Sequence, residues 1–186
     1  MKLIILDRDG VINKDSNAYI KMPVEWAPLP KSLEAIARLN QAGYKIVVIT
    51  NQSAVGRGYC SLETLKEIHG KMETMLAQHS GKIAKIYFCP HTPEDNCNCR
   101  KPKTGMFAQV AADYNIDLHD VINIGDSLRD MQAGTAIGCT NYLVKTGNGL
   151  QTLSTLEKNS ATENQVKNIK AFADLADATD YILRFS

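Results

Sequence analysis

Carboxylates, a hydroxyl and a lysine stand near the ends of short apolar runs in this sequence. Asp7 and Asp9 follow a run of four aliphatic residues. Thr50 ends a second such run, Asp126 comes directly after a third, and Lys101 lies between them. A carboxylate is ionised at neutral pH and can attack phosphorus without a separate base, while several carboxylates together can bind a hard cation. A hydroxyl and an ammonium group donate to negatively charged oxygens. These residue types could together supply a nucleophile, bind a divalent cation and bind an anionic ligand.

The place of the Asp-x-Asp pair in the chain distinguishes a reactive pair from a surface pair. Alone, two such aspartates are usually solvated or form a turn. In an open α/β sheet, however, ligands bind at the carboxyl ends of the strands, and Gly10 lets the backbone turn tightly there. Asp130 follows Asp126 by four residues and would face the same side of a helix. Direct ligation of the cation and orientation of a metal-bound water both stay open for Asp130, and we favour the second.

A compact cluster of soft metal ligands lies between Thr50 and Lys101. Three thiols and one imidazole fall within the eleven residues 89–99: Cys89, His91, Cys97 and Cys99. This set suits tetrahedral Zn²⁺, and with all four positions filled by protein the ion would be structural. Arg100 and Lys101 follow at once, so closing the loop on zinc would fix the direction of both cations. The other histidines are isolated and are expected at the surface: His69, His79 and His119.

Short apolar runs alternate with stretches of helical periodicity. The expected strands read as continuous apolar runs, as in LIIL, KIVVIT and DVINIG, which is typical of a parallel sheet covered by helices on both faces. We therefore predict a doubly wound α/β fold in one domain, residues 1–186, with the zinc loop inserted. The expected strands are 3–6, 45–49, 83–88, 121–124 and 142–144, and the expected helices are 32–41, 62–78, 107–114 and 129–136. Residues 152–168 are expected as a loop or weak helix before a last strand and helix in 169–185.

Charge and hydropathy exclude several classes of function. Lysine plus arginine (21) nearly balances aspartate plus glutamate (20), so no overall field attracts nucleic acid or an anionic membrane surface. The N-terminal apolar run is too short for a signal peptide or a membrane span, so we expect a soluble protein of the cytoplasm. Nothing in the sequence requires more than a monomer.

In order and spacing, the motifs resemble those of the haloacid dehalogenase-like (HAD) superfamily of phosphatases. The resemblance implies a Rossmann-like core and a magnesium-dependent reaction through an aspartyl phosphate. It implies that Asp7 is the nucleophile and that Asp9 is the general acid and base. It also implies that Mg²⁺ is held by Asp7, Asp126 and the backbone carbonyl of Asp9. Thr50 and Lys101 would stabilise the transferring phosphoryl group.

Within that superfamily, the chain is most similar to the capless D-glycero-D-manno-heptose-1,7-bisphosphate 7-phosphatases of nucleotide-heptose biosynthesis. The segments that carry the similarity are DRDGVIN, TNQSAVGRG, CPH…CNCRKP and GDSLRDMQAG. The resemblance implies that Arg100 sets recognition of the phosphorylated sugar, and Arg57 offers a second cation for a bisphosphate. Asn17-Ala18 depart from relatives that often carry a glycine and an aromatic residue there. Substrate contacts are implied for Asp15, Ser16, Asn17, Ala18, Thr50, Asn51, Gln52, Ser53, Arg57, Arg100 and Lys101.

Two other functions are compatible with parts of the sequence. Histidinol-phosphate phosphatases are close relatives that share the aspartates, the zinc loop and the Arg-Lys-Pro. A catalytically silent protein that binds a partner through its zinc loop is an alternative of another class. It is disfavoured because every position with a chemical role is filled. The preferred anomer of the heptose bisphosphate stays open.

Overall fold

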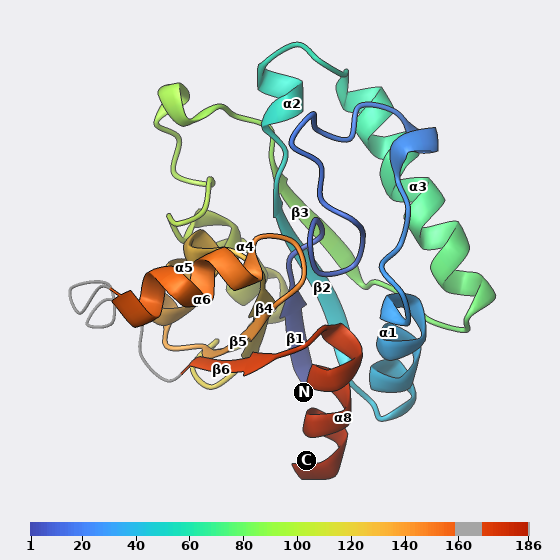
Figure 1. Ribbon diagram of the computed structural model, residues 1–186, viewed down its shortest axis with the longest axis vertical. Coiled ribbons are helices and arrows are strands. Elements are labelled where there is room, and N and C mark those ends of the chain that lie inside the picture. The colour runs from blue at the N-terminus through green and yellow to red at the C-terminus, as the bar shows by residue number, and fades with distance from the viewer. Residues whose placement is uncertain (159–168, 186) are drawn as a thin grey trace.

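Six parallel strands form the centre of the computed structural model, which describes residues 1–158 and 169–185 (Figure 1). The strand order is β3-β2-β1-β4-β5-β6, and every neighbouring pair is parallel. The order confirms the expected doubly wound sheet, in which the chain winds outward in both directions from β1. The strands are β1 (Leu3–Leu6), β2 (Lys45–Asn51), β3 (Lys85–Cys89), β4 (Ile122–Gly125), β5 (Thr140–Val144) and β6 (Ile169–Phe172).

Helices cover both faces of this sheet, because alternate strand side chains point to opposite sides. Ile4 and Leu6 belong to the apolar core on one face, and Leu3 and Ile5 to the core on the other. The first face is covered by α1 (Ser32–Gln41), α3 (Leu62–Gln78) and α8 (Leu175–Phe185). The second is covered by α4 (Gly105–Tyr114), α5 (Leu128–Ile137) and α6 (Gly149–Lys158).

The ends of several helices follow the sequence signals. The Ser61 hydroxyl accepts a hydrogen bond of 3.0 Å from the backbone amide of Thr64 and so caps α3. Gly43, with a φ of 86°, lets the chain turn away just after α1. Short helices were not predicted, among them α2 (Ser53–Gly56).

The segment around α6 is more regular than the loop or weak helix that the sequence predicted. A loop or weak helix was expected over 152–168, and the structure has the helix α6 up to Lys158. The helix forms because Leu153 and Leu156 lie on one face, where they pack with Met131 and Leu143. The rest of that prediction, 159–168, lies outside the described residues.

The connections between the strands are short, as predicted for a capless enzyme. From β1 to β2 the chain forms a loop, the short helix η1 (Pro23–Glu25) and α1. From β2 to Lys101 it forms α2, α3, β3 and the short helix η2 (Pro93–Asp95). No helix among the described residues is long and apolar enough to cross a membrane.

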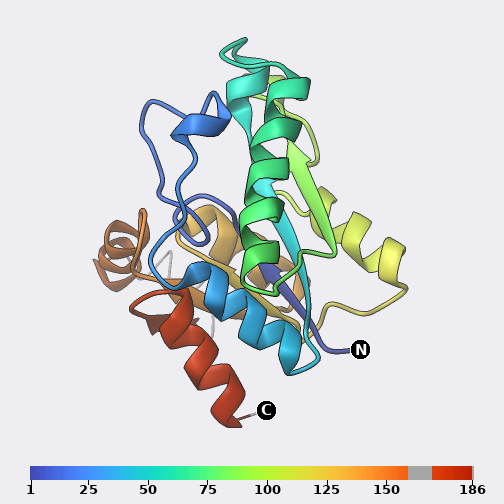
Figure 2. The same ribbon diagram turned by 90° about the vertical axis from the view of Figure 1, so that its right-hand side faces the viewer.

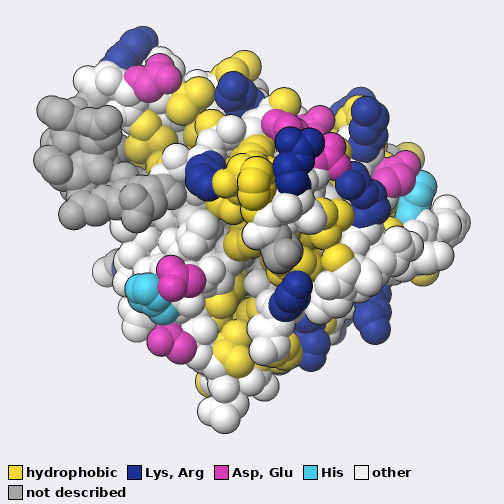
Figure 3. Space-filling view, turned by 90° about the horizontal axis from the view of Figure 1, so that it is seen from below, with side chains coloured by type: hydrophobic (Ala, Val, Ile, Leu, Met, Phe, Trp, Pro, Cys, Tyr) yellow, Lys and Arg dark blue, Asp and Glu magenta, His cyan; other side chains and the backbone are white. Residues whose placement is uncertain are grey.

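Both chain termini lie at the end of the molecule where β1 begins (Figures 1 and 2). Seen from that end, basic, acidic and apolar side chains are interspersed on the described surface (Figure 3). The residues with expected chemistry lie at the other ends of the strands.

Candidate active site

The candidate site lies where the strand order reverses, between β1 and β4. Strands on either side of this point lead into connections on opposite faces, which leaves a crevice at their carboxyl ends. Asp7 follows β1, Thr50 lies in the last part of β2, and Asp126 follows β4. All three line one cavity of about 400 Å³. The sheet thus brings together residues that are far apart in the chain.

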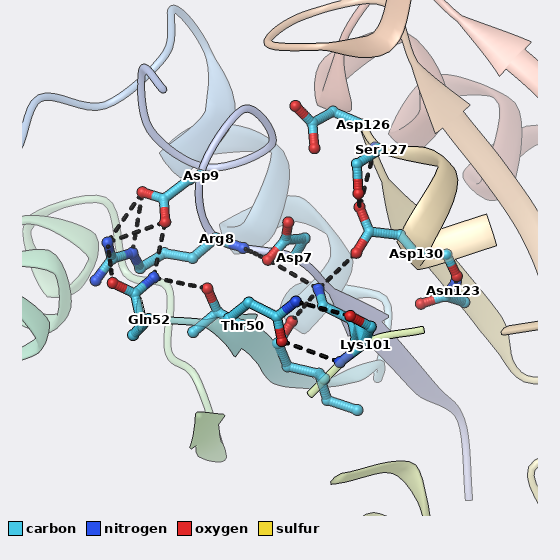
Figure 4. A network of polar contacts seen from close by, with 12 residues as sticks. Asp7, Arg8, Asp9, Thr50, Gln52, Lys101, Asn123, Asp126, Ser127 and Asp130 are labelled. Atoms are coloured by element: carbon cyan, nitrogen blue, oxygen red, sulfur yellow. Dashed lines mark hydrogen bonds and ion pairs between the residues drawn. The ribbon is translucent and has the colours of Figure 1, made fainter. Parts of the chain in front are cut away.

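Lys101 lies at the centre of an acidic group in this cavity (Figure 4). Its Nζ is 3.1 Å from Asp7 Oδ1 and 2.6 Å from Asp130 Oδ1. It also donates a hydrogen bond of 2.7 Å to the carbonyl of Ile49. Although burial favours the neutral amine, Asp130 and Asp7 raise the pKa of Lys101. Its three N–H groups are therefore all used, and it is a fixed positive charge between two carboxylates.

Three of the carboxylates are close enough to share one cation. Asp7, Asp126 and Asp130 each offer an oxygen, and these oxygens lie within 4.8 Å of one another. Burial, with the neighbouring Asp130 carboxylate adding to it, raises the pKa of Asp7 to about 7 and that of Asp126 to about 8. A cation would relieve this repulsion, and hard oxygen ligands of this kind suit Mg²⁺. The donor set thus fits the expected metal.

Gly10 and Asn148 shape the surroundings of Asp126. Gly10 has a φ of 78°, and a Cβ there would overlap Asp126 Oδ2. The backbone amide of Asn148 donates to that same oxygen at 2.7 Å, and its side-chain amide does so at 3.2 Å. The side-chain amide also donates to Asp15 Oδ2 at 2.9 Å, which links Asp126 to the rim of the cavity. Asn148 was not found from the sequence, because the loop after β5 carries no motif that marks it.

Asp130 is held from two sides. Its Oδ2 accepts hydrogen bonds from the Ser127 amide at 3.0 Å and from the Ser127 hydroxyl at 2.6 Å, which caps the start of α5. Although burial opposes ionisation, Lys101 lowers the pKa of Asp130. With one oxygen on Ser127 and the other on Lys101, Asp130 has its lone pairs largely engaged. This arrangement is compatible with the favoured role, orientation of a metal-bound water.

Asp9 is not one of the three carboxylates that could share a cation, and hydrogen-bond donors surround it. Figure 4 shows its carboxylate turned toward the guanidinium of Arg8 and the amide of Gln52. Arg8 Nη2 is 3.0 Å from both carboxylate oxygens, and Asn13 and Gln52 each donate at 2.8 Å. Although burial opposes ionisation, Arg8 and these hydrogen bonds lower the pKa of Asp9. Asp9 is therefore an ionised carboxylate in this structure.

The predicted zinc ligands form one cluster. The Cys89 and Cys97 sulfurs are 3.5 Å apart, Cys99 lies 3.3 and 3.4 Å from them, and His91 Nδ1 is 3.2 Å from Cys99. Two ligands of one tetrahedral zinc ion are about 3.5–4 Å apart, so the four atoms fit such an ion. Although burial opposes it, hydrogen bonds from the Cys99 thiol and the Arg100 amide lower the pKa of Cys97 to about 6. The lowered pKa favours the thiolate, which is the form in which a cysteine binds a metal.

The rim of the cavity includes most of the expected substrate contacts. Asp15, Ser16, Asn17, Asn51, Gln52 and Ser53 line it, as do Arg57 and Arg100, whereas Ala18 does not. The pKa of Arg100 is lowered by burial and by the nearby guanidinium groups of Arg129 and Arg57. Three arginines therefore converge at the mouth. Lining residues that the sequence did not single out are Arg8, Tyr19, Ile20, Pro93, Ser127, Arg129 and Asn148.

One prediction about histidines was wrong. His69 was expected at the surface, but it is only 7% exposed and its ring packs edge-on against Phe88 at 5.9 Å. It lies on the inner side of α3, at the helical spacing of Leu65 and Met72, which are also buried. Burial and the positive charge of Arg8 lower the pKa of His69 to about 4. An isolated histidine gives no sign of this in the sequence unless its helix face is considered.

Fold and site together define a hydrolase of the HAD type. A family model described as HAD-hydrolase-like matches residues 98–177. The fold is also that of the L-2-haloacid dehalogenase from Xanthobacter autotrophicus, with a TM-score of 0.62 at 10% identity.

Relatives with higher sequence identity indicate which family of HAD-type hydrolases this is. A D-glycero-beta-D-manno-heptose-1,7-bisphosphate 7-phosphatase from Bordetella bronchiseptica is 54% identical over 154 residues, which is 83% of this chain and 86% of that protein. The Neisseria meningitidis serogroup A enzyme of the same name is 46% identical over 99% of this chain and 96% of its own length. The crystal structure of the B. bronchiseptica D,D-heptose 1,7-bisphosphate phosphatase, complexed with magnesium and phosphate, matches with a TM-score of 0.94, covering 100% of both chains at 46% identity. The chain belongs to this family of heptose-bisphosphate phosphatases, as the sequence motifs indicated, and the relatives favour neither alternative function.

Proposed function

We propose that this chain removes the 7-phosphate of D-glycero-β-D-manno-heptose 1,7-bisphosphate through a phosphoryl group carried briefly by Asp7. The observation that carries the proposal is the contact between Asp7 and Lys101 at 3.1 Å, inside a cavity that also holds Asp126. The choice of substrate rests on the relatives, of which several are named for the beta form of the sugar.

In the first step an Asp7 oxygen attacks phosphorus. A bond forms between this oxygen and phosphorus, and the bond from phosphorus to the sugar oxygen breaks on the opposite side. Asp9, once protonated, gives its proton to the departing sugar oxygen, which leaves as an alcohol. Asp9 must take up that proton before the step.

In the second step water returns the enzyme to its starting state. Asp9, now ionised, accepts a proton from a water molecule while the water oxygen attacks phosphorus. The bond from phosphorus to Asp7 breaks, and phosphate leaves. The donors around Asp9 that lower its pKa favour the ionised form that this step needs.

Charge in the cavity supports both steps. Asp7, Asp126 and the carbonyl of Asp9 would hold Mg²⁺, and Asp130 would orient a water on it. When bound, the ion offsets the repulsion between an anionic nucleophile and an anionic phosphate and stabilises the transferring phosphoryl oxygens. Lys101 adds a fixed positive charge beside Asp7, and the Thr50 hydroxyl lies at the same edge.

The cationic mouth supports a substrate with a second phosphate. Arg57, Arg100 and Arg129 line the cavity. A second phosphate would bring an anion to a place where guanidinium groups repel one another, and guanidinium pairs well with phosphate in two-point contacts. A monophosphate such as histidinol phosphate would leave this mouth without an anion.

Zinc in the loop 89–99 would act at a distance from the chemistry. The Cys99 ligand is followed directly by Arg100 and Lys101, and the Asn51 side chain bonds both the Lys101 amide at 3.0 Å and its carbonyl at 3.1 Å. The zinc loop is thereby joined to the end of β2. We propose that the zinc ion fixes the orientation of the Arg100 and Lys101 side chains.

All five cysteines are free of disulfide bonds, which supports a reducing compartment such as the cytoplasm.

The proposed function is tested by comparing kcat/KM for the β and α forms of the heptose bisphosphate and for histidinol phosphate, with and without Mg²⁺. The expected order places the β form first. Asp7→Asn is expected to abolish turnover while keeping the fold, because an amide cannot attack phosphorus in this way. A preference for histidinol phosphate would refute the substrate, and an active Asp7→Asn would refute the mechanism.

A further inference from the structure

The side chain of Gln52 lies between two groups of the proposed reaction. Its Nε2 donates to Asp9 Oδ2 and to Thr50 Oγ1, each at 2.8 Å. Its Oε1 accepts from Arg8 Nη2 at 2.9 Å. The residue is only 5% exposed. Gln52 is thus a bridge between the general acid and base on one side and a phosphoryl-binding hydroxyl on the other.

The partners determine which way the amide points. A carboxylate oxygen accepts and a guanidinium donates, so the Nε2 must face Asp9 and the Oε1 must face Arg8. The opposite orientation would place two acceptors together and two donors together. An amide has two N–H groups, and both are used, one on Asp9 and one on Thr50. Gln52 therefore has no side-chain donor left for a substrate in this conformation.

The bond to Thr50 also sets the direction of its hydroxyl. Because Thr50 Oγ1 accepts the hydrogen of Gln52, its own hydrogen points to another acceptor. Thr50 lines the cavity beside Asp7, where the phosphoryl oxygens would arrive. The amide of Gln52 in this way makes the hydroxyl a donor toward the cavity.

The main chain keeps Gln52 in place. Its backbone amide donates a hydrogen bond of 2.7 Å to the carbonyl of Cys89, which joins the end of β2 to the end of β3. Arg8, its other side-chain partner, is 1% exposed. Thr50 is likewise 1% exposed. Since the backbone and these two partners are fixed, the side chain has one favoured position.

We propose that Gln52 is a positioning residue of the phosphatase reaction, which holds Asp9 within reach of the leaving group and turns the Thr50 hydroxyl toward the phosphoryl group. The inference rests on the proposed function. It assigns Gln52 a role through Asp9 and Thr50, in place of a direct contact with the sugar.

The test uses the magnesium-loaded enzyme and a series of phosphate monoesters with leaving groups from p-nitrophenol to simple alcohols. kcat/KM for each ester reports phosphoryl transfer to Asp7. A poor leaving group must be protonated as it leaves, and a good one need not be. If Asp9 is misplaced, the reduction in kcat/KM therefore becomes larger as the leaving group becomes poorer. Gln52→Leu is expected to lower kcat/KM about tenfold for the nitrophenyl ester, through Thr50, and about 100-fold or more for an alkyl ester.

Three further variants complete the experiment. Gln52→Glu keeps the length and the acceptor for Arg8 but has no N–H group, so it is expected to show the same graded loss. In a protein that already carries Asp9→Asn, no proton is donated to the leaving group. Adding Gln52→Leu to that protein is therefore expected to lower kcat/KM by the same factor for every ester. Gln109→Leu, on the exposed side of α4, is the matched control and is expected to leave all values unchanged.

The outcomes separate the two proposals. An equal loss for all esters in both Gln52 variants, or wild-type values in Gln52→Glu, would overturn the role of Gln52 alone. Thermal unfolding of each variant shows whether the fold is kept, and Gln52→Glu decides the result if Gln52→Leu does not fold. A wild-type protein without magnesium-dependent hydrolysis of any ester would contradict the proposed function and the role of Gln52 together.

Discussion

Burial of His69 predicts a measurable loss of stability in mild acid. In the folded protein its pKa is about 4, because burial and Arg8 disfavour the charged ring. In the unfolded chain the pKa returns to its ordinary value of about 6.5. As pH falls below that value, the imidazole binds a proton in the unfolded chain but stays neutral in the folded protein, so the free energy of unfolding decreases. Stability from this group is complete above about pH 6.5 and is lost progressively as the pH falls toward 4.

The size of the effect follows from the difference of about 2.5 pKa units. At 1.36 kcal/mol for each unit, the full loss is about 3.4 kcal/mol. By about pH 5.5 roughly 1.4 kcal/mol of it is lost, since the unfolded ring is then about nine-tenths protonated. The buried Nε2 of His69 has no hydrogen-bond partner among the described residues, so no acceptor compensates a proton there.

Urea unfolding of the wild type and of His69→Gln, between about pH 7.5 and pH 5.5, measures this difference. Glutamine does not titrate, so the wild type is expected to lose about 1.4 kcal/mol more than the variant over this range. Other acids and the zinc ligands titrate equally in both proteins and cancel. His79→Gln is the matched control, because the His79 side chain is 38% exposed. Parallel pH profiles for the wild type and His69→Gln would refute the assignment of a buried, neutral ring.

Three other predictions follow from the site. Lys101→Met is expected to lower the free energy of unfolding by about 3–5 kcal/mol, because the buried Asp130 loses its partner. Mg²⁺ is expected to raise the melting temperature of this variant more than that of the wild type. Equal shifts of the melting temperature by calorimetry would contradict the idea that Lys101 and Mg²⁺ both offset the negative charge of the carboxylates. Asn148→Ala is expected to weaken Mg²⁺ binding about tenfold, measured by titration calorimetry, since a hydrogen bond that orients Asp126 is removed. Removing zinc with a chelator and restoring Mg²⁺ is expected to raise KM, because Arg100 loses its fixed direction; unchanged kinetics in verified zinc-free protein would exclude a role for the ion in binding.

Much of the site could be predicted from the chain, because its chemistry depends on residue types next to strand ends. Asp7 and Asp126 directly follow apolar runs, and parallel strands carry such residues to one edge. The zinc ligands lie within eleven residues, so their proximity is a local property of the loop. The fold class followed in the same way from the alternation of strands and helices.

Other features were decided only by the tertiary structure. Asn148 reaches Asp126 across 22 positions, and Gln52 reaches Asp9 across 43, through contacts that no spacing in the sequence marks. The burial of His69 depends on how α3 packs against β3, and the state of Asp9 depends on how many donors surround it. The physical reason is that residue type and strand position specify which groups can react, whereas hydrogen-bond partners and desolvation, which set direction and pKa, arise only when distant segments pack together.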